Sequence, residues 1–278
     1  EHLARAGTSK TIVLACRNTT RCNDARDKAA TLLPHGSSTQ LVTAILDLSS
    51  RSSIEQFSAN LLNLLSTTAQ RQGGDEHTLL QEPVIDVLIN NAGIFSKSLD
   101  KNYLDGIEEH IYVNYLGHVL LTHLLWPTLQ ISGARVVSLS SLSTIFPTNP
   151  LAGWFAWDQQ WSDKSSTFSG LMSYFRSKRA NLIFAHQLHQ TMASSTAGPD
   201  TTGVSSVASH PGFSRSEIWF NGGKCIPSWL SKGVFTNPIF SMSPTQGALT
   251  QIWAALDRQQ VPSGSYVGPR WWLYGNPI

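Results

Sequence analysis

The sequence predicts an α/β protein with a doubly wound parallel sheet, in three layers with helices on both faces. Apolar runs of strand length alternate with helical patterns, and short polar or glycine-bearing motifs follow several of these runs. The predicted strands are Thr11–Cys16, Gln40–Leu46, Val84–Ile89, Arg135–Leu139, Val204–Ser209 and a short one near Tyr266. The predicted helices are Asp24–Leu33, Ser52–Leu65, Leu104–Trp126, Tyr174–Met192 and Pro244–Leu256, and the polar segment Thr67–Gln81 is predicted to be a surface loop.

Four of these elements carry polar motifs in a fixed order. The apolar run Ile85–Ile89 leads into Asn90-Asn91-Ala92-Gly93, and the next helix contains Val113-Asn114-Tyr115-Leu116-Gly117. The strand after it ends in Ser140-Ser141, and the strand that ends at Ser209 runs into His210-Pro211-Gly212. In open α/β sheets, ligands bind at the carboxyl ends of the strands, so we expect a binding site at this edge.

Bulk composition limits the class of protein. With 278 residues, no internal repeat and no linker, the chain predicts a single domain over residues 1–278. A net charge of +2 without a Lys/Arg cluster argues against nucleic-acid binding. The most apolar window, Ile111–Trp126, is too short and too polar to span a bilayer.

Cysteine usage bears on the compartment. Cys16, Cys22 and Cys225 have neither metal-ligand spacing nor an even number, so we expect free thiols in a reducing compartment, the cytoplasm, and no metal site.

Tyr174 and Lys178 are the most informative pair of residues. Within a helix, a spacing of four places the phenol and the ammonium one turn apart on the same face. A free phenol has a pKa of about 10, and a neighbouring cation lowers that pKa and produces a usable acid and base. By itself the spacing is also compatible with a packed tyrosine and a solvated lysine.

In this order, the motifs resemble the short-chain dehydrogenase/reductase family, and most closely its retinol-dehydrogenase-like branch, from Leu3 to Val267. The resemblance implies a Rossmann-type NAD(P)-binding fold and hydride transfer between a nicotinamide and a carbonyl or alcohol carbon. It implies that Tyr174 is the general acid and base, that Lys178 assists it and contacts the ribose, and that Ser141 bonds the substrate oxygen. Ser140 and Ser143 are close enough in sequence to be alternatives to Ser141.

Asn114 is implied by the same resemblance to hold a water that links Lys178 to solvent. The alternative is a buried amide that braces its helix.

Further motifs resemble cofactor contacts. They are Asn90, Ala92 and Gly93 at the strand end, Asp47 for the adenine, and Pro211, Gly212 and Ser216 for the nicotinamide amide, beside Tyr174 and Lys178. Asp47 could equally be the N-cap of the helix at Ser52. His210, at the end of a buried strand, is given no catalytic role.

Cofactor choice depends on the end of the first predicted strand. Enzymes that prefer NAD place an acid there for the ribose 2′-hydroxyl, whereas Arg17-Asn18-Thr19-Thr20 contains none. A guanidinium binds a 2′-phosphate well, so we expect NADP(H), with Arg17 as the main determinant. A solvated strand-end arginine is the alternative.

Two Trp-rich stretches, 154–168 and 219–240, either pack on the body of the protein or form the wall of a pocket. The resemblance places a substrate loop at 213–243. We therefore expect a small, fairly apolar carbonyl or alcohol substrate. A monomer and a homo-oligomer both stay open.

The family's first strand and its Gly-rich turn, T-G-x-x-x-G-x-G, are absent from this sequence, and residues 1–7 read as the end of a helix stopped by Gly7. Without a central strand, Thr11–Cys16 and Gln40–Leu46 have no neighbour joining them to Val84–Ile89. We expect a fragment of a longer enzyme. A catalytically inactive pseudoenzyme or binding module is the main alternative, and a related lyase or epimerase is a third.

Overall fold

The computed structural model describes residues 11–72, 83–95, 102–103, 107–145, 167–194, 203–214 and 241–270. The expected helix end at residues 1–7, both Trp-rich stretches, Ser216 and Cys225 lie outside this part of the chain. So does most of the expected substrate loop at 213–243.

The strands form two parallel ladders and one small antiparallel pair. β1 (Thr11–Cys16) pairs with β2 (Gln40–Ile45), with Thr11 opposite Gln40. The larger sheet has the order β3-β6-β7-β8, all parallel, with bounds Val87–Asn90, Arg135–Leu139, Ser205–Ser209 and Tyr266–Val267. β4 (Asn102–Tyr103) and β5 (Ile107–Glu108) form the antiparallel pair.

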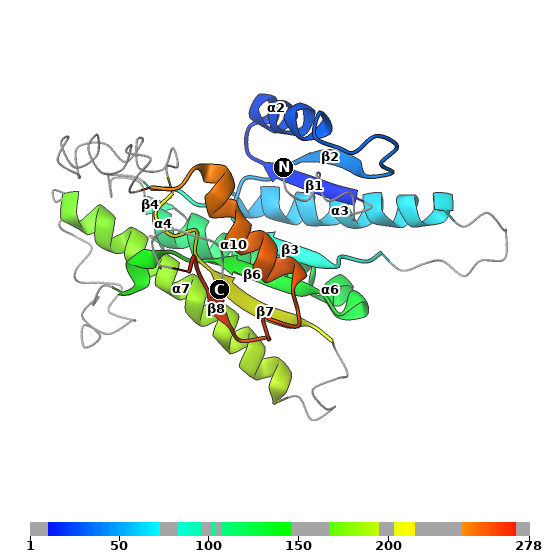
Figure 1. Ribbon diagram of the computed structural model, residues 1–278. Helices are drawn as coiled ribbons and strands as arrows, with labels where there is room; N and C mark the ends of the chain where they lie inside the picture. Colours follow the sequence, from blue (N-terminus) through cyan, green and yellow to red (C-terminus); the bar gives the residue numbers. More distant parts are fainter. Residues whose placement is uncertain are drawn as a thin grey trace.

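Helices cover both faces of the larger sheet, which makes three layers (Figure 1). Strand β6 needs helices on both faces because its successive side chains point to opposite faces of the sheet. Val136 packs into the cluster formed with α3 and α5, and Val137 packs into the cluster formed with α10. The helices are α2 (Thr19–Ala30), α3 (Arg51–Gln72), α4 (Glu109–Ile111), α5 (Gly117–Leu124), α6 (Trp126–Ser132), α7 (Thr167–Ala193) and α10 (Pro244–Leu256), with the π-helical turn η1 (Tyr112–Leu116) and the 3₁₀ turn η2 (Leu142–Ile145).

One hydrophobic core joins the two parallel ladders. Helix α3 lies between them and contributes side chains that pack both toward the end of β2 and toward α5. The buried members of this cluster are Leu46, Leu48, Ile54, Phe57, Leu61, Val113, Leu121, Leu125, Leu129, Ala134, Val136 and Val204. Within the described residues, side-chain packing and not a shared strand ladder therefore connects the two parts.

The two ladders stay separate in the described part of the chain, as the sequence predicted from the lack of a joining strand. β1 and β3 do not pair directly, and each has a strand partner on one edge only within the described residues. The α/β fold with a parallel sheet in three layers is confirmed.

Several predicted bounds were wrong for local reasons. Helix α2 begins at Thr19 and not at Asp24, because the Asn18 side chain accepts a hydrogen bond from Arg21 N and caps it. Helix α3 continues to Gln72, so the predicted loop Thr67–Gln81 is helical in its first part. The predicted helix Leu104–Trp126 is interrupted by η1, a π-helical turn around Asn114.

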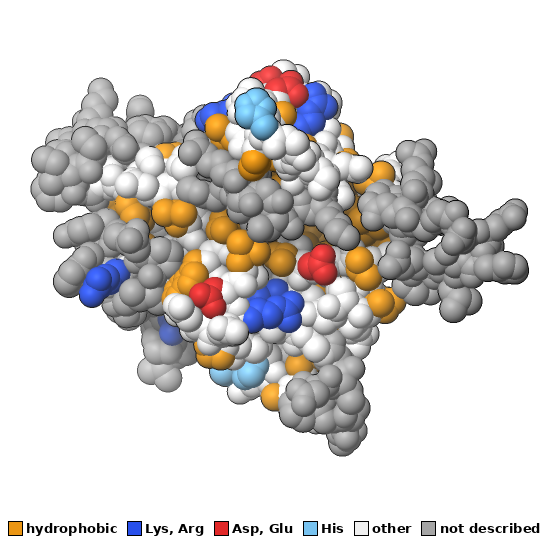
Figure 2. All heavy atoms as spheres, turned by 45° about the vertical axis from the view of Figure 1, so that its right-hand side comes forward, with side chains coloured by type: hydrophobic (Ala, Val, Ile, Leu, Met, Phe, Trp, Pro, Cys, Tyr) orange, Lys and Arg blue, Asp and Glu red, His pale blue; other side chains and the backbone are white. Residues whose placement is uncertain are grey.

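Five large hydrophobic side chains of the described residues are more than a third exposed, namely Ile45, Val84, Ile131, Ile183 and Leu256. The space-filling view shows hydrophobic side chains gathered across the middle of one face (Figure 2). Among the described helices, none combines the length and the hydropathy that crossing a bilayer requires.

Arg135 is a fully buried arginine that closes the end of α10. Its Nε donates to the carbonyl oxygen of Ala254 in the last turn of the helix, and its Nη2 donates to that of Val261. A cation at a helix C-terminus also compensates the helix dipole. Burial lowers the Arg135 pKa to about 10, which leaves the guanidinium protonated at neutral pH.

We expect Arg135→Met to lower the free energy of unfolding by about 1–3 kcal/mol, because two buried carbonyl groups lose charge-assisted hydrogen bonds and this loss exceeds the gain from removing the buried charge. Urea denaturation measures it. Arg258→Met is the matched control, since exposed Arg258 also donates to a backbone carbonyl, that of Gly133, and should change stability by only about 0.5 kcal/mol. Equal effects of the two substitutions would contradict this role of Arg135.

Candidate active site

Tyr174, Lys178 and Ser141 come together at the carboxyl end of β6. Tyr174 and Lys178 lie one turn apart on α7, and Lys178 Nζ is 5.9 Å from the centroid of the Tyr174 ring. The Ser141 side chain hydrogen-bonds the Tyr174 phenol. Tyr174 and Lys178 are 5% and 2% exposed, so the alternative of a solvated lysine is wrong.

Burial dominates the electrostatics of the pair. It raises the pKa of Tyr174 to about 12, against a smaller lowering by the hydrogen bond from Ser141. It also lowers the pKa of Lys178 to about 8. The sequence predicted a phenol pKa lowered by the ammonium, and this was wrong because removal of both groups from water has the larger effect.

The three neighbouring serines have different positions. Ser140 is buried and donates from Oγ to the backbone oxygen of Lys178, so it fixes α7 to β6. Ser143 is buried too, and its backbone N–H donates to Ser141 Oγ. Of the three, Ser141 is the one whose side chain interacts with the Tyr174 phenol, and its predicted hydrogen bond to a substrate oxygen stays a prediction.

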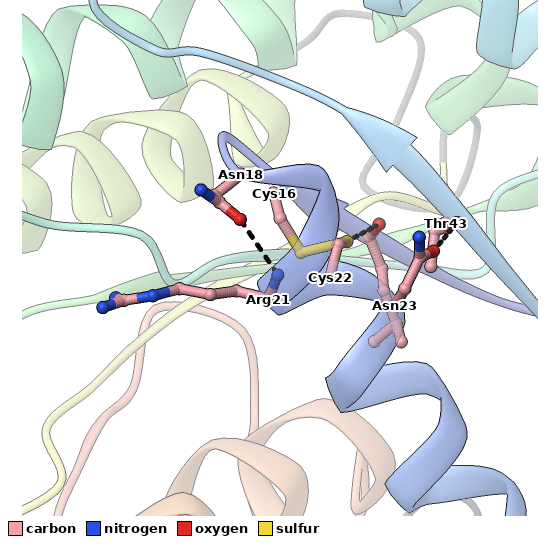
Figure 3. The surroundings of a disulfide bond; sticks show 7 residues. Cys16, Asn18, Arg21, Cys22, Asn23 and Thr43 are labelled. Carbon is pink, nitrogen blue, oxygen red and sulfur yellow. Dashed lines mark hydrogen bonds between the residues drawn. A yellow bond between two sulfur atoms is a disulfide. The ribbon is translucent and has the colours of Figure 1, made fainter.

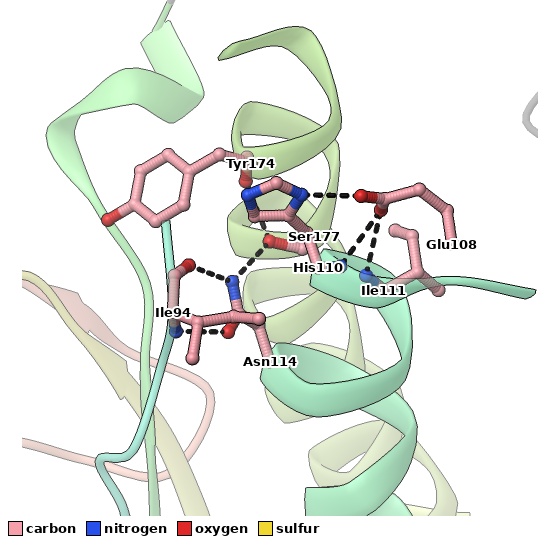
Figure 4. A network of polar contacts seen from close by, with 7 residues as sticks. All are labelled: Ile94, Glu108, His110, Ile111, Asn114, Tyr174 and Ser177. Atoms are coloured by element: carbon pink, nitrogen blue, oxygen red, sulfur yellow. Dashed lines mark hydrogen bonds and ion pairs between the residues drawn. The ribbon is translucent and has the colours of Figure 1, made fainter. Parts of the chain in front are cut away.

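Asn114 connects three elements (Figure 4). Its Oδ1 accepts from Ile94 N at 2.7 Å, and its Nδ2 donates to Ile94 O and to Ser177 Oγ, each at 3.0 Å. The amide therefore braces the loop after β3 and helix α7 against η1. A π-helical turn at this place is typical of functional sites. The predicted water-holding role of Asn114 stays a prediction.

The motif after β3 lies directly beside Lys178. A Cβ placed on Gly93 would be 3.0 Å from Lys178 Nζ and 3.4 Å from Asn114 Oδ1, so glycine permits this approach. Ala92 is exposed next to it. Asn90 is buried and donates from Nδ2 to Thr122 Oγ1, which fixes β3 to α5. The predicted cofactor contacts of these three residues stay predictions.

Asp47 forms a turn after β2. Its Oδ1 accepts from the backbone N and the hydroxyl of Ser49, at 2.9 and 2.6 Å. The alternative that Asp47 caps the next helix was wrong, because Ser50 Oγ accepts from Ser53 N at the start of α3. Asp47 therefore keeps its side chain near the strand ends, and its adenine contact stays a prediction.

His210 has a structural position. Its Nδ1 accepts from the backbone N–H of Gly212, and its ring packs on Tyr266. Burial lowers its pKa to about 4. Pro211 and Gly212 lie directly after β7, whereas Ser216 is outside the described residues.

A disulfide between Cys16 and Cys22 corrects the expectation of free thiols (Figure 3). It joins the end of β1 to the first turn of α2 and encloses Arg17, which is exposed. Sequence spacing could not reveal it, because only the fold brings the two sulfurs together. The argument from thiols for a cytoplasmic location is therefore lost, and that location stays a prediction. The described residues contain no group of three His, Cys, Asp or Glu side chains placed to hold a metal.

Sequence reasoning passed over two buried histidines near the site. His118 Nδ1 lies 3.1 Å from Asn114 O, and burial, with a smaller effect of the Lys178 charge, lowers the His118 pKa to about 3. His110 pairs with Glu108 beside Tyr174 (Figure 4). The signal available in the sequence was Glu108-Glu109-His110 directly before the Val113-Asn114 motif.

Comparison with known proteins identifies the family. The family model described as short chain dehydrogenase matches residues 2–155. Mouse (Mus musculus) retinol dehydrogenase 12 is 32% identical over 266 residues, which cover 95% of this chain and 71% of the relative. Mouse retinol dehydrogenase 14 is 30% identical over 268 residues, with coverages of 92% and 70%. A short-chain dehydrogenase/reductase from Caenorhabditis elegans, solved with cofactor, superposes with a TM-score of 0.63 at 16% identity, covering 96% of this chain and 86% of that one.

The chain therefore belongs to the short-chain dehydrogenase family, whose members are oxidoreductases that bind NAD(P). Within the family it lies in the retinol-dehydrogenase-like branch.

The buried ammonium should lower stability at neutral pH. The Lys178 pKa is about 8 in the folded protein against an ordinary 10.5. The unfolded chain thus binds more protons between these values, so the cost is full below about pH 8 and disappears toward pH 10.5. We expect Lys178→Met to raise the free energy of unfolding at pH 7 by about 2–3 kcal/mol, at about 1.4 kcal/mol per pKa unit less the lost hydrogen bond to Leu139 O.

Urea denaturation at pH 7 and pH 10 tests this, and the gain should shrink at the higher pH. Leu139 O keeps a donor, Asn181 Nδ2 at 3.0 Å, in the variant. Lys28→Met, on the exposed side of α2, is the control and should show no such pH dependence. A less stable Lys178→Met protein at pH 7 would count against the cost of the buried charge.

Proposed function

We propose that this protein is an NADP(H)-dependent oxidoreductase that interconverts a carbonyl and an alcohol on a small apolar molecule, with Tyr174 as general acid and base. One observation supports it most strongly. A phenol, a hydroxyl and an ammonium from separate positions in the sequence, Tyr174, Ser141 and Lys178, meet at the carboxyl end of a parallel strand. Family membership makes an oxidoreductase the expected class.

The residues divide the chemistry between them. The nicotinamide, when bound, supplies or accepts the hydride. In reduction, Tyr174 gives its phenolic proton to the substrate oxygen, and Ser141 donates a hydrogen bond to the same oxygen. The ammonium of Lys178 stabilises the phenolate that remains on Tyr174. In oxidation the phenolate takes the proton from the alcohol, and each group acts in reverse.

The residues present suit a dinucleotide. Gly93 leaves no side chain between the strand-end loop and the Lys178 ammonium, so a ribose hydroxyl can come within reach of that ammonium. Pro211, Gly212 and Ser216 are the residues predicted to contact the nicotinamide amide. At the other end, exposed Arg17 is the residue we propose for the 2′-phosphate.

For the substrate we propose an apolar aldehyde or its alcohol. The relatives named retinol dehydrogenases suggest all-trans-retinaldehyde as the first compound to assay. The Trp-rich stretch at 219–240 is the proposed apolar wall of the pocket.

Replacement of Tyr174 by Phe should lower kcat for NADPH-dependent reduction of all-trans-retinaldehyde about 10²- to 10⁴-fold, because the proton donor is lost. The dissociation constant for NADPH, measured by fluorescence titration, should stay within about threefold, since the phenol is not its main contact. Tyr115→Phe removes a half-buried phenol that packs on Phe184 and serves as the control. Equal turnover by wild type and Tyr174→Phe would remove Tyr174 from the mechanism.

Replacement of Arg17 by Ala should weaken NADPH binding about 10- to 100-fold and leave NADH binding unchanged, because a charge-assisted hydrogen bond to the 2′-phosphate is lost. Parallel titrations with the two cofactors measure it. Arg26→Ala is the control, since Arg26 pairs with Asp27 on the same helix. Comparable turnover of wild type with NADH and NADPH would contradict the preference.

The pseudoenzyme alternative makes a different prediction. A protein that keeps the fold only as a binding module should show no saturable NADPH binding, and the same titration of wild type therefore separates the two functions. The observation that favours the enzyme is the buried Lys178. Burial of a cation costs free energy, and a protein that serves only as a scaffold gains nothing from a buried cation beside a tyrosine.

A further inference from the structure

Glu108 and His110 form a buried carboxylate–imidazole pair at the start of α4. The His110 Nδ1 is 2.5 Å from Glu108 Oε1, and the two side chains are 0% and 9% exposed, for His110 and Glu108 respectively. Glu108 Oε2 accepts from the backbone N–H groups of His110 and Ile111, at 3.0 and 3.2 Å, and caps the helix. Both carboxylate oxygens are therefore engaged, and the imidazole is held at a fixed angle.

The imidazole lies between the Glu108 carboxylate and the Tyr174 side chain (Figure 4). The centroids of the His110 and Tyr174 rings are 6.3 Å apart, with the rings at 78°. Phe95, from the loop after β3, completes the cluster at 6.0 Å from His110 and 5.2 Å from Tyr174. The Tyr174 ring is thus packed by rings from two other elements, with centroid distances and angles typical of edge-to-face contacts.

The pair is also tied to the rest of the site through one helical face. His110 and Asn114 are four residues apart, and Asn114 bonds Ile94 and Ser177, the neighbours of Gly93 and Lys178. α4 and η1 both pack on α7. A shift of the imidazole would therefore move the Tyr174 ring, and with it the Asn114 hydrogen bonds that hold the segments next to Lys178.

Helix capping alone does not account for His110. The cap uses the backbone N–H of His110, which any residue except proline provides. An apolar side chain could fill the space at less cost, because a buried acid–base pair contributes little to stability. The imidazole supplies what an apolar side chain lacks, a ring whose Nδ1 is held by the Glu108 carboxylate.

We propose that Glu108 and His110 are positioning residues for Tyr174: the carboxylate fixes the imidazole, and the imidazole ring sets the direction of the phenol toward Ser141 and the substrate oxygen. This inference rests on the proposed function of Tyr174. It assigns no proton transfer to the pair. An orientation error of about 1 Å can cost 10²-fold in rate, so the effect should fall on kcat.

Four variants test the proposal in the assay with NADPH and all-trans-retinaldehyde. His110→Asn keeps a donor for Glu108 and removes the ring, and Glu108→Ala removes the anchor. Each should lower kcat about 10- to 100-fold and leave the Kd for NADPH within about threefold. Glu108→Gln should stay within about threefold of wild type, because its amide oxygen can still cap α4 while its NH₂ holds the imidazole.

His189→Phe is the matched control. His189 also has a side-chain partner at Nδ1, Ser263 Oγ at 3.0 Å, and lies on α7, 15 residues beyond Tyr174, roughly 22 Å along the helix. It should keep the wild-type kcat. Rates are expressed per NADPH-binding site, so a variant that folds only in part is still compared correctly.

Wild-type kcat per site in both His110→Asn and Glu108→Ala would overturn the positioning role while the proposed function stands. A loss in Glu108→Gln equal to that in Glu108→Ala would overturn it as well, since the charge and not the anchoring would then matter. Absence of turnover by wild type would instead overturn the proposed function, and the inference with it.

Discussion

The burial of the Lys178 ammonium is the constraint on which the site depends. A cation removed from water needs oxygen acceptors and tight surroundings, or it destabilises the fold. Lys178 Nζ donates to Leu139 O at the end of β6, and the chain passes close to it at Gly93, where a side chain would meet it. Asn114 holds that passing segment through both backbone groups of Ile94. The loop after β3, the π-helical turn and α7 are thus arranged around one charge.

The same constraint explains why the pKa values of Tyr174 and Lys178 shift in opposite directions. Tyr174 and Lys178 are both removed from water, so burial pushes each toward its neutral form, the phenol upward and the ammonium downward. Ser141 partly offsets this at the phenol. A site that is dry and rigid favours charge stabilisation by fixed groups, since they need no reorganisation during the reaction. Rigidity here comes from ring packing around Tyr174 and from the hydrogen bonds that the side-chain amides of Asn114 and Asn181 make around Lys178.

The two parallel ladders position different parts of the candidate site. The ladder β1-β2 carries Arg17 and Asp47 at its carboxyl ends, whereas Ser141 follows β6 of the other ladder and lies next to Tyr174 and Lys178 on α7. Because α3 packs between the two ladders in one hydrophobic core, their carboxyl ends keep a defined relation, although no strand of the described residues joins them by backbone hydrogen bonds. The disulfide at Cys16 adds a covalent brace at the end of β1, next to the proposed phosphate-binding arginine.

The sequence by itself determined the alternation of the main strands and helices and the spacing of Tyr174 and Lys178 on one helix, whereas Ser141 was implied by the resemblance to a family. The first two follow from local patterns: apolar runs with period two or 3.6, and motifs at strand ends that topology must bring to one edge. Only the tertiary structure decided the Cys16–Cys22 bridge, the place of Ser50 and not Asp47 as a cap, the direction of the Tyr174 pKa shift, and the Glu108–His110 pair beside the phenol. Each of these depends on the distance between side chains or on the exclusion of water, and residue spacing in the sequence determines neither.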